Sequence, residues 1–387
     1  MEILGYARPD GRVGIRNHVA IIYTVQCAQL AAEKIARAVK GTQVLGWPGC
    51  FVNERSFQKL ISLGQHPNVA AVLVVGLGCE HMDYHLVRDE IAKSGKPTEL
   101  ILVQEEGGTL KTAEKGARIA ERLSQYASTV PRQEMSLSDL IVGAECGGSD
   151  ATSGLAANPS VGAFADLLVG RGGTMIVEEP SELLGCEEAL AERAISPEVG
   201  REVIETIRAC QAEGHQVGQF SIGPGNVEGG LTTIEEKSAG ALAKSGTSPL
   251  MGVLRAGELP PGKGLYLLSA DRVAKKIPGV EKRATNVPMD QGGDPKGVVW
   301  LIASGAHIVL FTTGRGNPAG CAVSPVIKIC GNPLTYRRME DNMDINAGAI
   351  IEGEKTVAEV GRQIFDEVLA VANGKLTKAE LLGHDEY

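Results

Sequence analysis

Residues 69–80, VAAVLVVGLGCE, form a strand pattern that runs directly into a polar turn. The first seven residues are apolar and mostly small or β-branched, as in a central parallel strand that is covered on both faces. A Gly-Leu-Gly turn follows, and the segment ends on Cys79 and Glu80. In open parallel sheets, ligands bind outside the carboxyl ends of the strands. The stretch therefore predicts an α/β fold with a site at this end of the strand.

The rest of the chain repeats the order strand, loop, helix, which is typical of parallel sheets with helices on both faces. We predict two such α/β domains, at residues 1–131 and 132–387, separated by a linker at residues 131–138. The first domain opens with a basic loop, and the second carries Gly-rich loops suited to a substrate. Residues 275–296 are polar and rich in Gly and Pro, and we expect them to form a flexible loop or lid.

Composition narrows the class of protein. The net charge of -9 argues against nonspecific binding to nucleic acid or to an anionic membrane, because both require basic surfaces. No segment approaches the roughly 18 apolar residues that cross a bilayer, and the polar N-terminus does not resemble a signal peptide. The eight cysteines form no CxxC pair, so a disulfide scaffold is not expected. We expect a cytoplasmic protein that acts on a small molecule.

Three cysteines share one kind of position. Cys50, Cys79 and Cys146 each follow a short or Gly-containing turn just past the end of a predicted strand. If these strands deliver them to one edge, three thiolates with an open fourth position suit an iron–sulfur cluster or a mononuclear iron site. Cys146 lies beyond the predicted linker, so convergence requires that the two sheets face each other. The alternative is that each is a small buried residue, as free cysteines often are.

Histidines and acids near the predicted strand ends could also carry chemistry. His81 and His85 are four residues apart, which places both on one face of the helix predicted after Cys79. They could ligate a metal, shuttle a proton or simply be solvated. Acidic pairs at residues 105–106 and 178–179 end two other predicted strands. Carboxylates there can act as bases or metal ligands, or can complement helix N-termini.

The segment FTTGRGN, residues 311–317, predicts an anion site. Its strand opens into the hydroxyls of Thr312 and Thr313, exposed backbone N–H groups and the guanidinium of Arg315, which together can bind a carboxylate. The alternative is a Gly-rich turn with a surface arginine. The basic N-terminal loop adds three candidates for the same anion: Arg16, Asn17 and His18.

Seven segments, taken in order, resemble the large domain of the altronate/galactarate dehydratase family, and the similarity extends over nearly the whole chain. The segments are GYARPDGRVGIRNHVAI (5–21), HPNVAAVLVVGLGCE (66–80), QEEGGTLKT (104–112), ECGGSDATSGLAANPSVG (145–162), GNVEGGLTTIEEKSAG (225–240), FTTGRGNPAGCAVSPVIKI (311–329) and DNMDINAGAI (341–350).

The resemblance implies a reaction. Family members dehydrate sugar acids to 2-keto-3-deoxy acids and depend on iron. A base removes the proton beside the substrate carboxylate, the neighbouring hydroxyl leaves, and iron assists as a Lewis acid. The candidates are Glu80, His81 and Lys237 as base or acid, Cys50, Cys79 and Cys146 as iron ligands, and Arg315, Thr312 and Thr313 for the substrate carboxylate.

The resemblance also implies a partner. Fused family members carry a small SAF-type domain before the segment that begins here at residue 5. We therefore expect a separate small SAF-type subunit that supplies a histidine, and an oligomeric enzyme.

Two other functions remain open. Residues 271–297 differ from the stretch expected in sugar-acid dehydratases, and a difference in a loop beside the pocket leaves more than one substrate class open. A related branch, the large subunit of sulfolactate sulfo-lyase, shares the GNVEGGLTTIEEK and PSELLG-like segments. It lacks cysteines that match Cys50 and Cys79 and the ending seen here at residues 342–348, which favours the dehydratase branch. The remaining alternative is a non-catalytic binding protein of the same fold.

Overall fold

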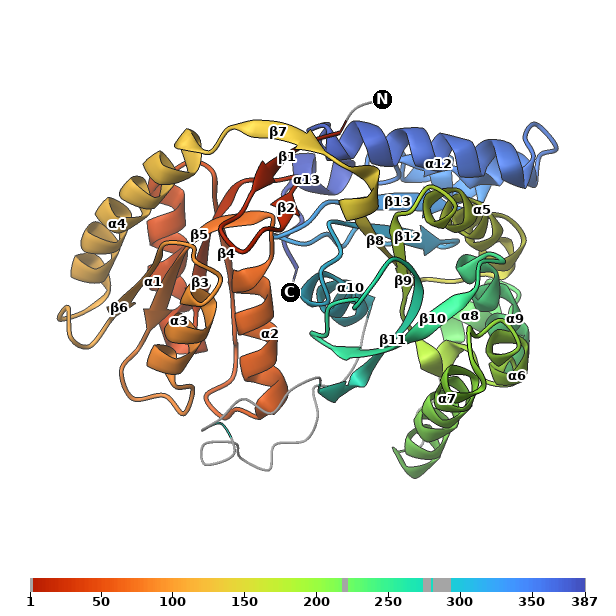
Figure 1. Cartoon of the computed structure of the whole chain (residues 1–387), viewed down its shortest axis with the longest axis horizontal. Helices are drawn as coiled ribbons and strands as arrows, with labels where there is room; N and C mark the ends of the chain where they lie inside the picture. Colours follow the sequence, from red (N-terminus) through yellow and green to blue (C-terminus); the bar gives the residue numbers. More distant parts are fainter. Residues whose placement is uncertain (1–2, 218–221, 274–279, 281–293, 387) are drawn as a thin grey trace.

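The computed structural model describes residues 3–217, 222–273, 280 and 294–386. It contains two parallel sheets flanked by helices and a small antiparallel sheet (Figure 1). This confirms the predicted α/β class. The predicted loop at residues 275–296 lies outside the described residues, apart from Val280 and residues 294–296. Within the described ranges, no helix is both long enough and apolar enough to cross a membrane.

The strand predicted at the start of residues 69–80 is β5 (Val69–Gly76), and all of its residues are buried. It belongs to a parallel sheet of order β4-β3-β5-β6. Helices α1 and α4 bury apolar side chains against one face, and α2 and α3 cover the other. The elements are β3 (His18–Tyr23), α1 (Gln26–Ala38), β4 (Thr42–Gly46), α2 (Glu54–Gln65), α3 (Tyr84–Ala92), β6 (Thr98–Leu102) and α4 (Thr109–Thr129).

The second parallel sheet has the order β10-β11-β9-β8-β12-β13-β14. Helices α5 and α12 pack on one face, and α10 packs on the other. The elements are β8 (Ile141–Cys146), α5 (Asn158–Val169), β9 (Thr174–Val177), β10 (Leu250–Ala256), β11 (Gly264–Val273), α10 (Asp294–Ala303), β12 (Ile308–Thr313), β13 (Val326–Cys330), β14 (Ile345–Asn346) and α12 (Val357–Ala372).

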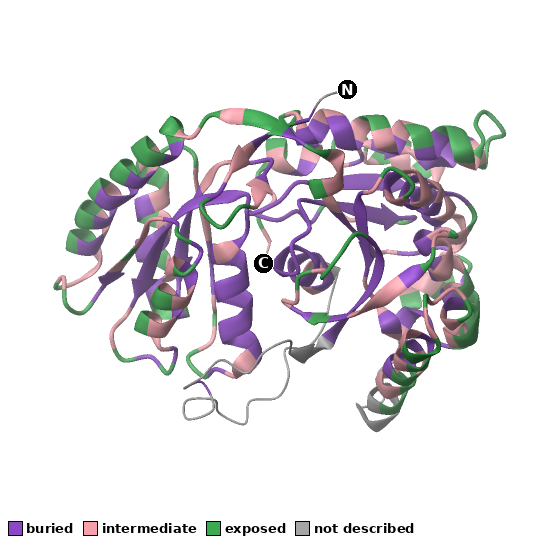
Figure 2. Ribbon diagram, viewed as in Figure 1, coloured by how far each residue is buried: buried purple, intermediate pink, exposed green. Residues whose placement is uncertain are grey.

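The two sheets share one apolar layer. Phe57 and Leu60 of α2 belong to the same buried cluster as Val299 and Trp300 of α10. Figure 2 shows the central strands of both sheets buried, whereas α4 and α12 turn exposed residues outward. The remaining helices are α6 (Glu187–Ala191), α7 (Pro197–Val217), α8 (Pro224–Glu228), α9 (Ile234–Leu242), α11 (Pro333–Arg338) and α13 (Lys378–Leu382).

Two local predictions were wrong. The segment predicted as a linker forms β7 (Arg132–Met135), which pairs antiparallel with β1 (Ile3–Ala7) and thus joins a sheet with β2 (Val13–Gly14). Pairing with the distant N-terminus overrides its polar composition. His81 also precedes α3, because the Asp83 side chain accepts the Leu86 N–H and caps the helix. His81 and His85 therefore do not share a helix face.

Candidate active site

A cavity of about 330 Å³ lies at the carboxyl edge of the second sheet. Strand β8 continues to β9 on one side, whereas β12 lies on its other side. This switch in strand order marks where parallel sheets bind ligands. The cavity is lined by the end of β8, the loop after it, the start of α5, the segment after β9, and α9. The lining residues that concern us are Cys146, Asp150, Asn158, Glu182 and Lys237.

Glu182 lines the cavity and contacts two other lining residues. Its Oε1 lies 2.5 Å from Lys237 Nζ, and both side chains are only 9% exposed. Its Oε2 accepts the thiol proton of Cys146, the last residue of β8, at 2.9 Å. A carboxylate is therefore held between an ammonium and a thiol, with little water to screen either contact.

A second ion pair lies behind the first. Lys244 Nζ lies 2.6 Å from Glu179 Oε2, which also accepts the backbone N–H of Cys146 at 3.0 Å. Among the described residues, Glu179 is the only non-glycine residue with positive φ, at 74°. This backbone conformation costs on the order of 1–3 kcal/mol and occurs preferentially at functional sites. The ion pair and the amide hydrogen bond hold Glu179 in it.

Burial sets the protonation states. Burial, reinforced by the charge of Glu179, raises the pKa of Glu182 to about 7 against the opposing effect of Lys237. Burial also raises the pKa of Cys146 well above its ordinary value, so the thiol stays neutral. Burial alone would lower the pKa of Lys237, but the attraction of Glu182 outweighs it and the pKa is raised. At neutral pH, a half-ionised carboxyl thus faces a fixed cation, which suits a general base.

The loop after β8 lines the cavity and is bonded to the loop after β12. Asp150 Oδ1 accepts the Thr152 hydroxyl at 2.6 Å, and its Oδ2 accepts the Asn332 amide at 3.1 Å. Asn158 Oδ1 accepts the Thr312 hydroxyl at 2.7 Å. The Gly314 N–H donates to the Gly148 carbonyl at 3.2 Å. These bonds hold the two loops together beside the cavity.

The predicted anion loop contributes indirectly. Thr312 is buried in β12 and reaches the cavity through Asn158. The Thr313 hydroxyl accepts the Gly316 N–H at 2.9 Å. Arg315 is paired with Glu228 at 3.0 Å. Among the predicted site residues, Cys146 and Lys237 are the ones that line this cavity.

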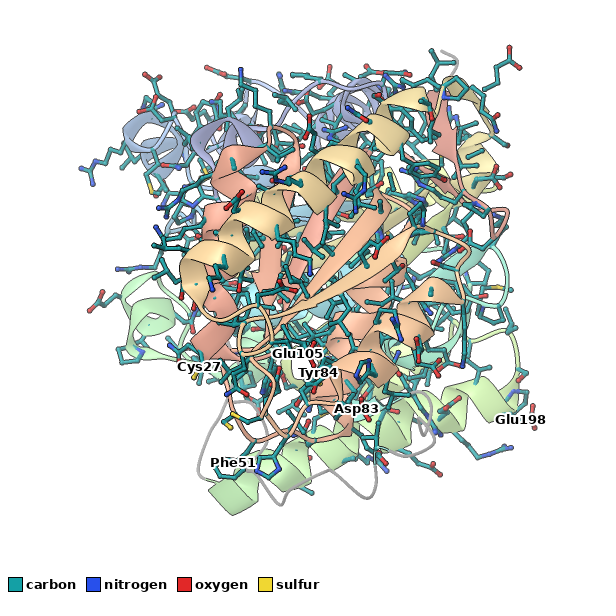
Figure 3. The ribbon with its side chains drawn as sticks, turned by 90° about the vertical axis from the view of Figure 1, so that its left-hand side faces the viewer. Cys27, Phe51, Asp83, Tyr84, Glu105 and Glu198 are labelled. Carbon is teal, nitrogen blue, oxygen red and sulfur yellow. The ribbon has the colours of Figure 1, made fainter. Side chains whose placement is uncertain are left out.

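Glu80, His81, Cys50 and Cys79 instead follow the carboxyl ends of β4 and β5 in the first sheet. Figure 3 labels Cys27 and Phe51 in this region. Glu80 is buried, and its carboxylate accepts the Thr24 hydroxyl and the Gly78 N–H, each at 2.7 Å. These contacts fix the turn after β5. The imidazole of His81 stacks on Phe51 with ring centroids 5.2 Å apart.

Within the described ranges, Cys50, Cys79 and Cys146 do not form a set with all ligand atoms within 4.8 Å, and they follow strands of two different sheets. Within the described ranges, two sets of potential metal ligands have all ligand atoms within 4.8 Å: Cys146–Glu179–Glu182 and Glu145–Glu178–Glu179. Neither includes Cys50 or Cys79, because Cys146 ends a strand of a different sheet. In the first set, Lys237 and Lys244 already neutralise the carboxylates. That set therefore fits proton transfer better than iron.

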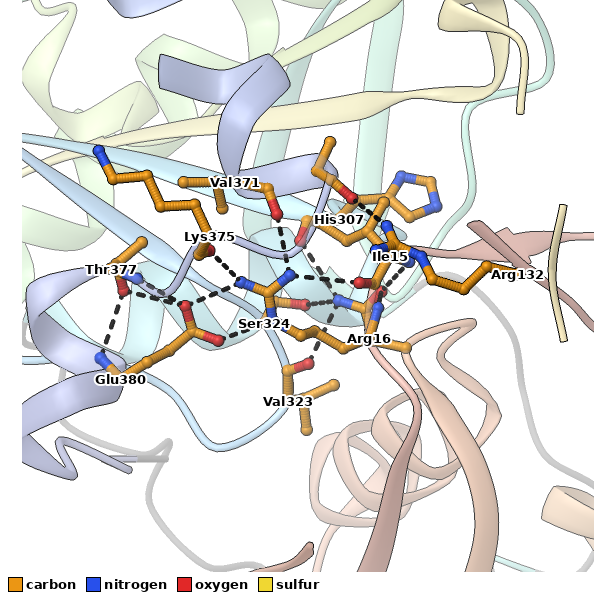
Figure 4. A network of polar contacts seen from close by, with 12 residues as sticks. Ile15, Arg16, Arg132, His307, Val323, Ser324, Val371, Lys375, Thr377 and Glu380 are labelled. Carbon is orange, nitrogen blue, oxygen red and sulfur yellow. Dashed lines mark hydrogen bonds and ion pairs between the residues drawn. The ribbon is translucent and has the colours of Figure 1, made fainter. Parts of the chain in front are cut away.

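Arg16, Asn17 and His18 do not line the cavity. Figure 4 shows Arg16 in a network with residues near the C-terminus. Arg16 is buried, and its five N–H groups donate to both Glu380 oxygens and to three backbone carbonyls. Asn17 accepts from Arg8 and donates to the Ala127 carbonyl. Burial lowers the pKa of His18 to about 4. Arg16 therefore has no free donor for a substrate anion.

Sequence patterns identified only part of the charged cluster. The acidic pair at residues 178–179 was recognisable as the end of a strand, and Lys237 lay in a family-like segment. Glu182 lies in the PSELLG segment that resembles the sulfo-lyase branch, although nothing there marks it as a base, and Lys244 carries no comparable signal. Glu182 lies in a short turn and Lys244 follows α9, so only the packing of α9 beside the β8 and β9 ends brings them together.

Two family profiles match the chain. The profile described as "D-galactarate/Altronate dehydratase, C-terminal" matches residues 137–387. The profile described as "D-galactarate dehydratase/Altronate hydrolase, second domain" matches residues 5–128.

Individual relatives agree with the profiles. The (2R)-sulfolactate sulfo-lyase subunit beta of Chromohalobacter salexigens is 36% identical, over 99% of this chain and 96% of its own. Altronate dehydratase of Bacillus subtilis is 33% identical, over 97% of this chain and 75% of its own. Galactarate dehydratase (L-threo-forming) of Escherichia coli is 32% identical, over 96% of this chain and 72% of its own. Profiles and relatives together show that this chain belongs to the D-galactarate/altronate dehydratase family, a family of hydro-lyases.

Proposed function

We propose that this protein eliminates water from a polyhydroxy carboxylate to give a 2-keto-3-deoxy acid. The observation that carries the proposal is Glu182, a cavity-lining carboxyl with a pKa of about 7 that is bonded to Lys237. Proton abstraction beside a carboxylate requires a base that is ionised near neutral pH and a cation for the charge that develops. The family supplies the reaction class, and the cavity supplies both groups.

The chain's own residues account for the proton transfer. Ionised Glu182 takes the proton from the carbon beside the substrate carboxylate. The electrons of that C–H bond form the carbon–carbon double bond, and the ammonium of Lys237 stabilises the enolate-like charge. The C–O bond of the neighbouring carbon breaks, and the hydroxyl leaves as water with the proton returned by Glu182. The enol then becomes the 2-keto-3-deoxy acid.

Sulfite elimination from a sulfonated hydroxy acid is the second candidate. The relative that carries this name matches almost end to end, over 99% of this chain and 96% of its own. Sulfite is a better leaving group than hydroxide, so the same base and cation would suffice with less Lewis-acid assistance.

The supporting relative is, by name, one subunit of an enzyme. We therefore include in the proposal a separate small SAF-type subunit that supplies a further catalytic group, and an oligomeric assembly in the cytoplasm.

The test is a substrate screen with and without a small SAF-type partner. Metal-replete protein is incubated with hexonates, hexarates and sulfolactate, and 2-keto-3-deoxy acid and free sulfite are measured. Formation of the keto acid from a sugar acid supports the dehydratase. Sulfite release alone would transfer the assignment to the sulfo-lyase. No turnover in either state would favour a binding protein.

A further inference from the structure

Three cysteines occupy equivalent positions after three adjacent strands. In the first sheet, Tyr23 of β3 is in register with Gly46 of β4 and with Val75 of β5. Cys27, Cys50 and Cys79 each follow the corresponding residue by four positions. Parallel strands in register bring such residues to the same edge. The switch in strand order of this sheet lies between β3 and β5, where the turns carrying Cys27 and Cys79 meet.

All three of these thiols are exposed. Free cysteine is among the most buried residue types, and Cys146, Cys321 and Cys330 of this chain follow that rule. Burial for packing therefore explains those three cysteines but not the exposed set.

Side-chain contacts tie the three turns to one another. Glu80, next to Cys79, accepts the Thr24 hydroxyl and so links the turn after β5 to the turn after β3. Phe51, next to Cys50, stacks on His81, which links the turn after β4 to the turn after β5. Figure 3 shows Cys27 and Phe51 at this one end of the molecule. A hydrogen bond and a ring contact thus hold the residues next to Cys79 and Cys50 in position.

Two of the three cysteines lie near hydrogen-bond donors. Cys27 lies in the first turn of α1, which has no side-chain cap and no acidic residue in that turn. Helix N-termini stabilise anions, and a metal-bound cysteine is a thiolate. Cys79 Sγ accepts a hydrogen bond from Gln104 Nε2 at 3.3 Å. Hydrogen bonds to sulfur are a usual feature of protein-bound iron–sulfur clusters.

We propose that Cys27, Cys50 and Cys79 bind an iron–sulfur cluster through three thiolates, leaving one iron without a protein thiolate. Thiolates around a single tetrahedral ion, at about 2.3 Å from it, would bring their sulfurs to within about 4 Å of each other. Within the described ranges, these cysteines form no set with all ligand atoms within 4.8 Å. In a cluster the thiolates bind different irons, so their sulfurs need not all lie within 4.8 Å of one another. Each thiol releases its proton on binding.

Cys27 takes the place that the sequence pattern assigned to Cys146. The sequence around Cys27 does not mark it as a ligand, because no glycine turn separates it from its strand and it lies in the first turn of a helix. Cluster binding by these cysteines does not depend on whether water or sulfite is eliminated, so it can be tested without substrate.

The experiment is anaerobic reconstitution of the full chain with ferrous iron and sulfide, followed by desalting. We expect more than one iron per chain, matching acid-labile sulfide, and the visible absorption of an iron–sulfur cluster. Cys27→Ser, Cys50→Ser and Cys79→Ser should each lose most of the iron and sulfide. Cys146→Ser and Cys186→Ser, the matched controls, should keep both. Thermal unfolding and circular dichroism of each variant establish that the loss does not reflect misfolding.

Three results would overturn the proposal. One is a wild-type chain without iron and sulfide after reconstitution. Another is a single iron without sulfide, which would indicate a mononuclear site. The third is retention of the cluster in Cys27→Ser with loss in Cys146→Ser, which would restore the set of cysteines expected from sequence. Should a serine variant fail to fold, the corresponding alanine variant replaces it. Failure of the substrate screen would leave these readouts unchanged.

Discussion

Glu182 shows how strongly local surroundings change a common side chain. Its carboxyl is 9% exposed, lies beside the carboxylate of Glu179, and is bonded to Lys237 and Cys146. Burial and like charge favour the neutral form, whereas the ammonium favours the ionised form. The balance places its pKa at about 7. Activity that depends on ionised Glu182 should therefore rise as the pH increases through about 7.

Replacing Glu182 with Gln keeps the size of the side chain but removes its ability to accept a proton. We expect kcat to fall by about 100- to 10,000-fold, the usual contribution of a general base. The rise of the residual activity near pH 7 should also disappear. Glu188→Gln, at a surface carboxylate paired with Arg208, is the control and should leave the pH profile of kcat unchanged. Wild-type activity and pH dependence in Glu182→Gln would exclude it as the base.

The loops that follow β8 and β12 are packed too closely for any added atom at Gly314. A Cβ there would lie 1.9 Å from Asp150 Oδ1. Gly314→Ala must therefore displace Asp150 and the groups that it binds. Such overpacking costs about 1–3 kcal/mol, so we expect a lower Tm and a lower kcat/KM.

The control for this change is Gly252→Ala in β10, where the nearest atom to the added Cβ is 3.7 Å away in Tyr266. Thermal unfolding and steady-state kinetics should separate the two alanine variants. Equal Tm and kcat/KM for Gly314→Ala and wild type would mean that the two loops adjust freely.

The packing of the whole molecule depends on Arg16, which joins the segment before the first sheet to α12 and α13 (Figure 4). Arg16→Met removes the guanidinium and leaves Glu380 without its cation. Breaking a buried pair in this way costs about 3–5 kcal/mol, measurable by denaturant unfolding. Arg37→Met, at an exposed helical pair, should change stability by less than about 0.5 kcal/mol. A higher KM with unchanged stability would instead support the sequence-based assignment of Arg16 to the substrate.

The contact between the two halves of the chain should also respond to pH. His307 Nδ1 accepts the Ile141 N–H at 3.0 Å, and Nε2 donates to the Val13 carbonyl at 2.8 Å, so the buried ring is neutral. Burial lowers the pKa of His307 to about 4 from an ordinary 6.5. Between these values the unfolded chain binds more protons, so stability is present above pH 6.5 and is lost as the pH falls toward 4.

This single histidine should contribute about 3 kcal/mol to the loss of stability between pH 6.5 and 4. Urea unfolding of wild type and His307→Gln across this range measures the contribution. The variant should be less stable at pH 7 and should lose less stability on acidification. An identical slope of unfolding free energy against pH in both proteins would contradict the neutral, buried state of His307.

Local sequence patterns were sufficient to predict the α/β class, the buried strand β5, most strand–helix units and the family. These follow from local patterns of apolar residues and turns and from ordered motifs, none of which depends on how distant segments pair. The sequence also predicted chemistry at strand ends, and two of the residues that it proposed for the site, Cys146 and Lys237, line the cavity.

Only the tertiary structure shows which strand ends lie at the same edge of a sheet. Cys146 lies on a different sheet from Cys50 and Cys79, and strand order is set by long-range pairing that no local pattern contains. The same holds for Glu182 and Lys244, which packing brings beside the end of β8, and for Arg16, whose donors are taken by residues near the far end of the chain. The turn after the strand at residues 69–80 thus shares a sheet edge with the turns that carry Cys27 and Cys50, whereas Cys146 ends a strand of the other sheet, because register within one sheet determines which strand ends share an edge.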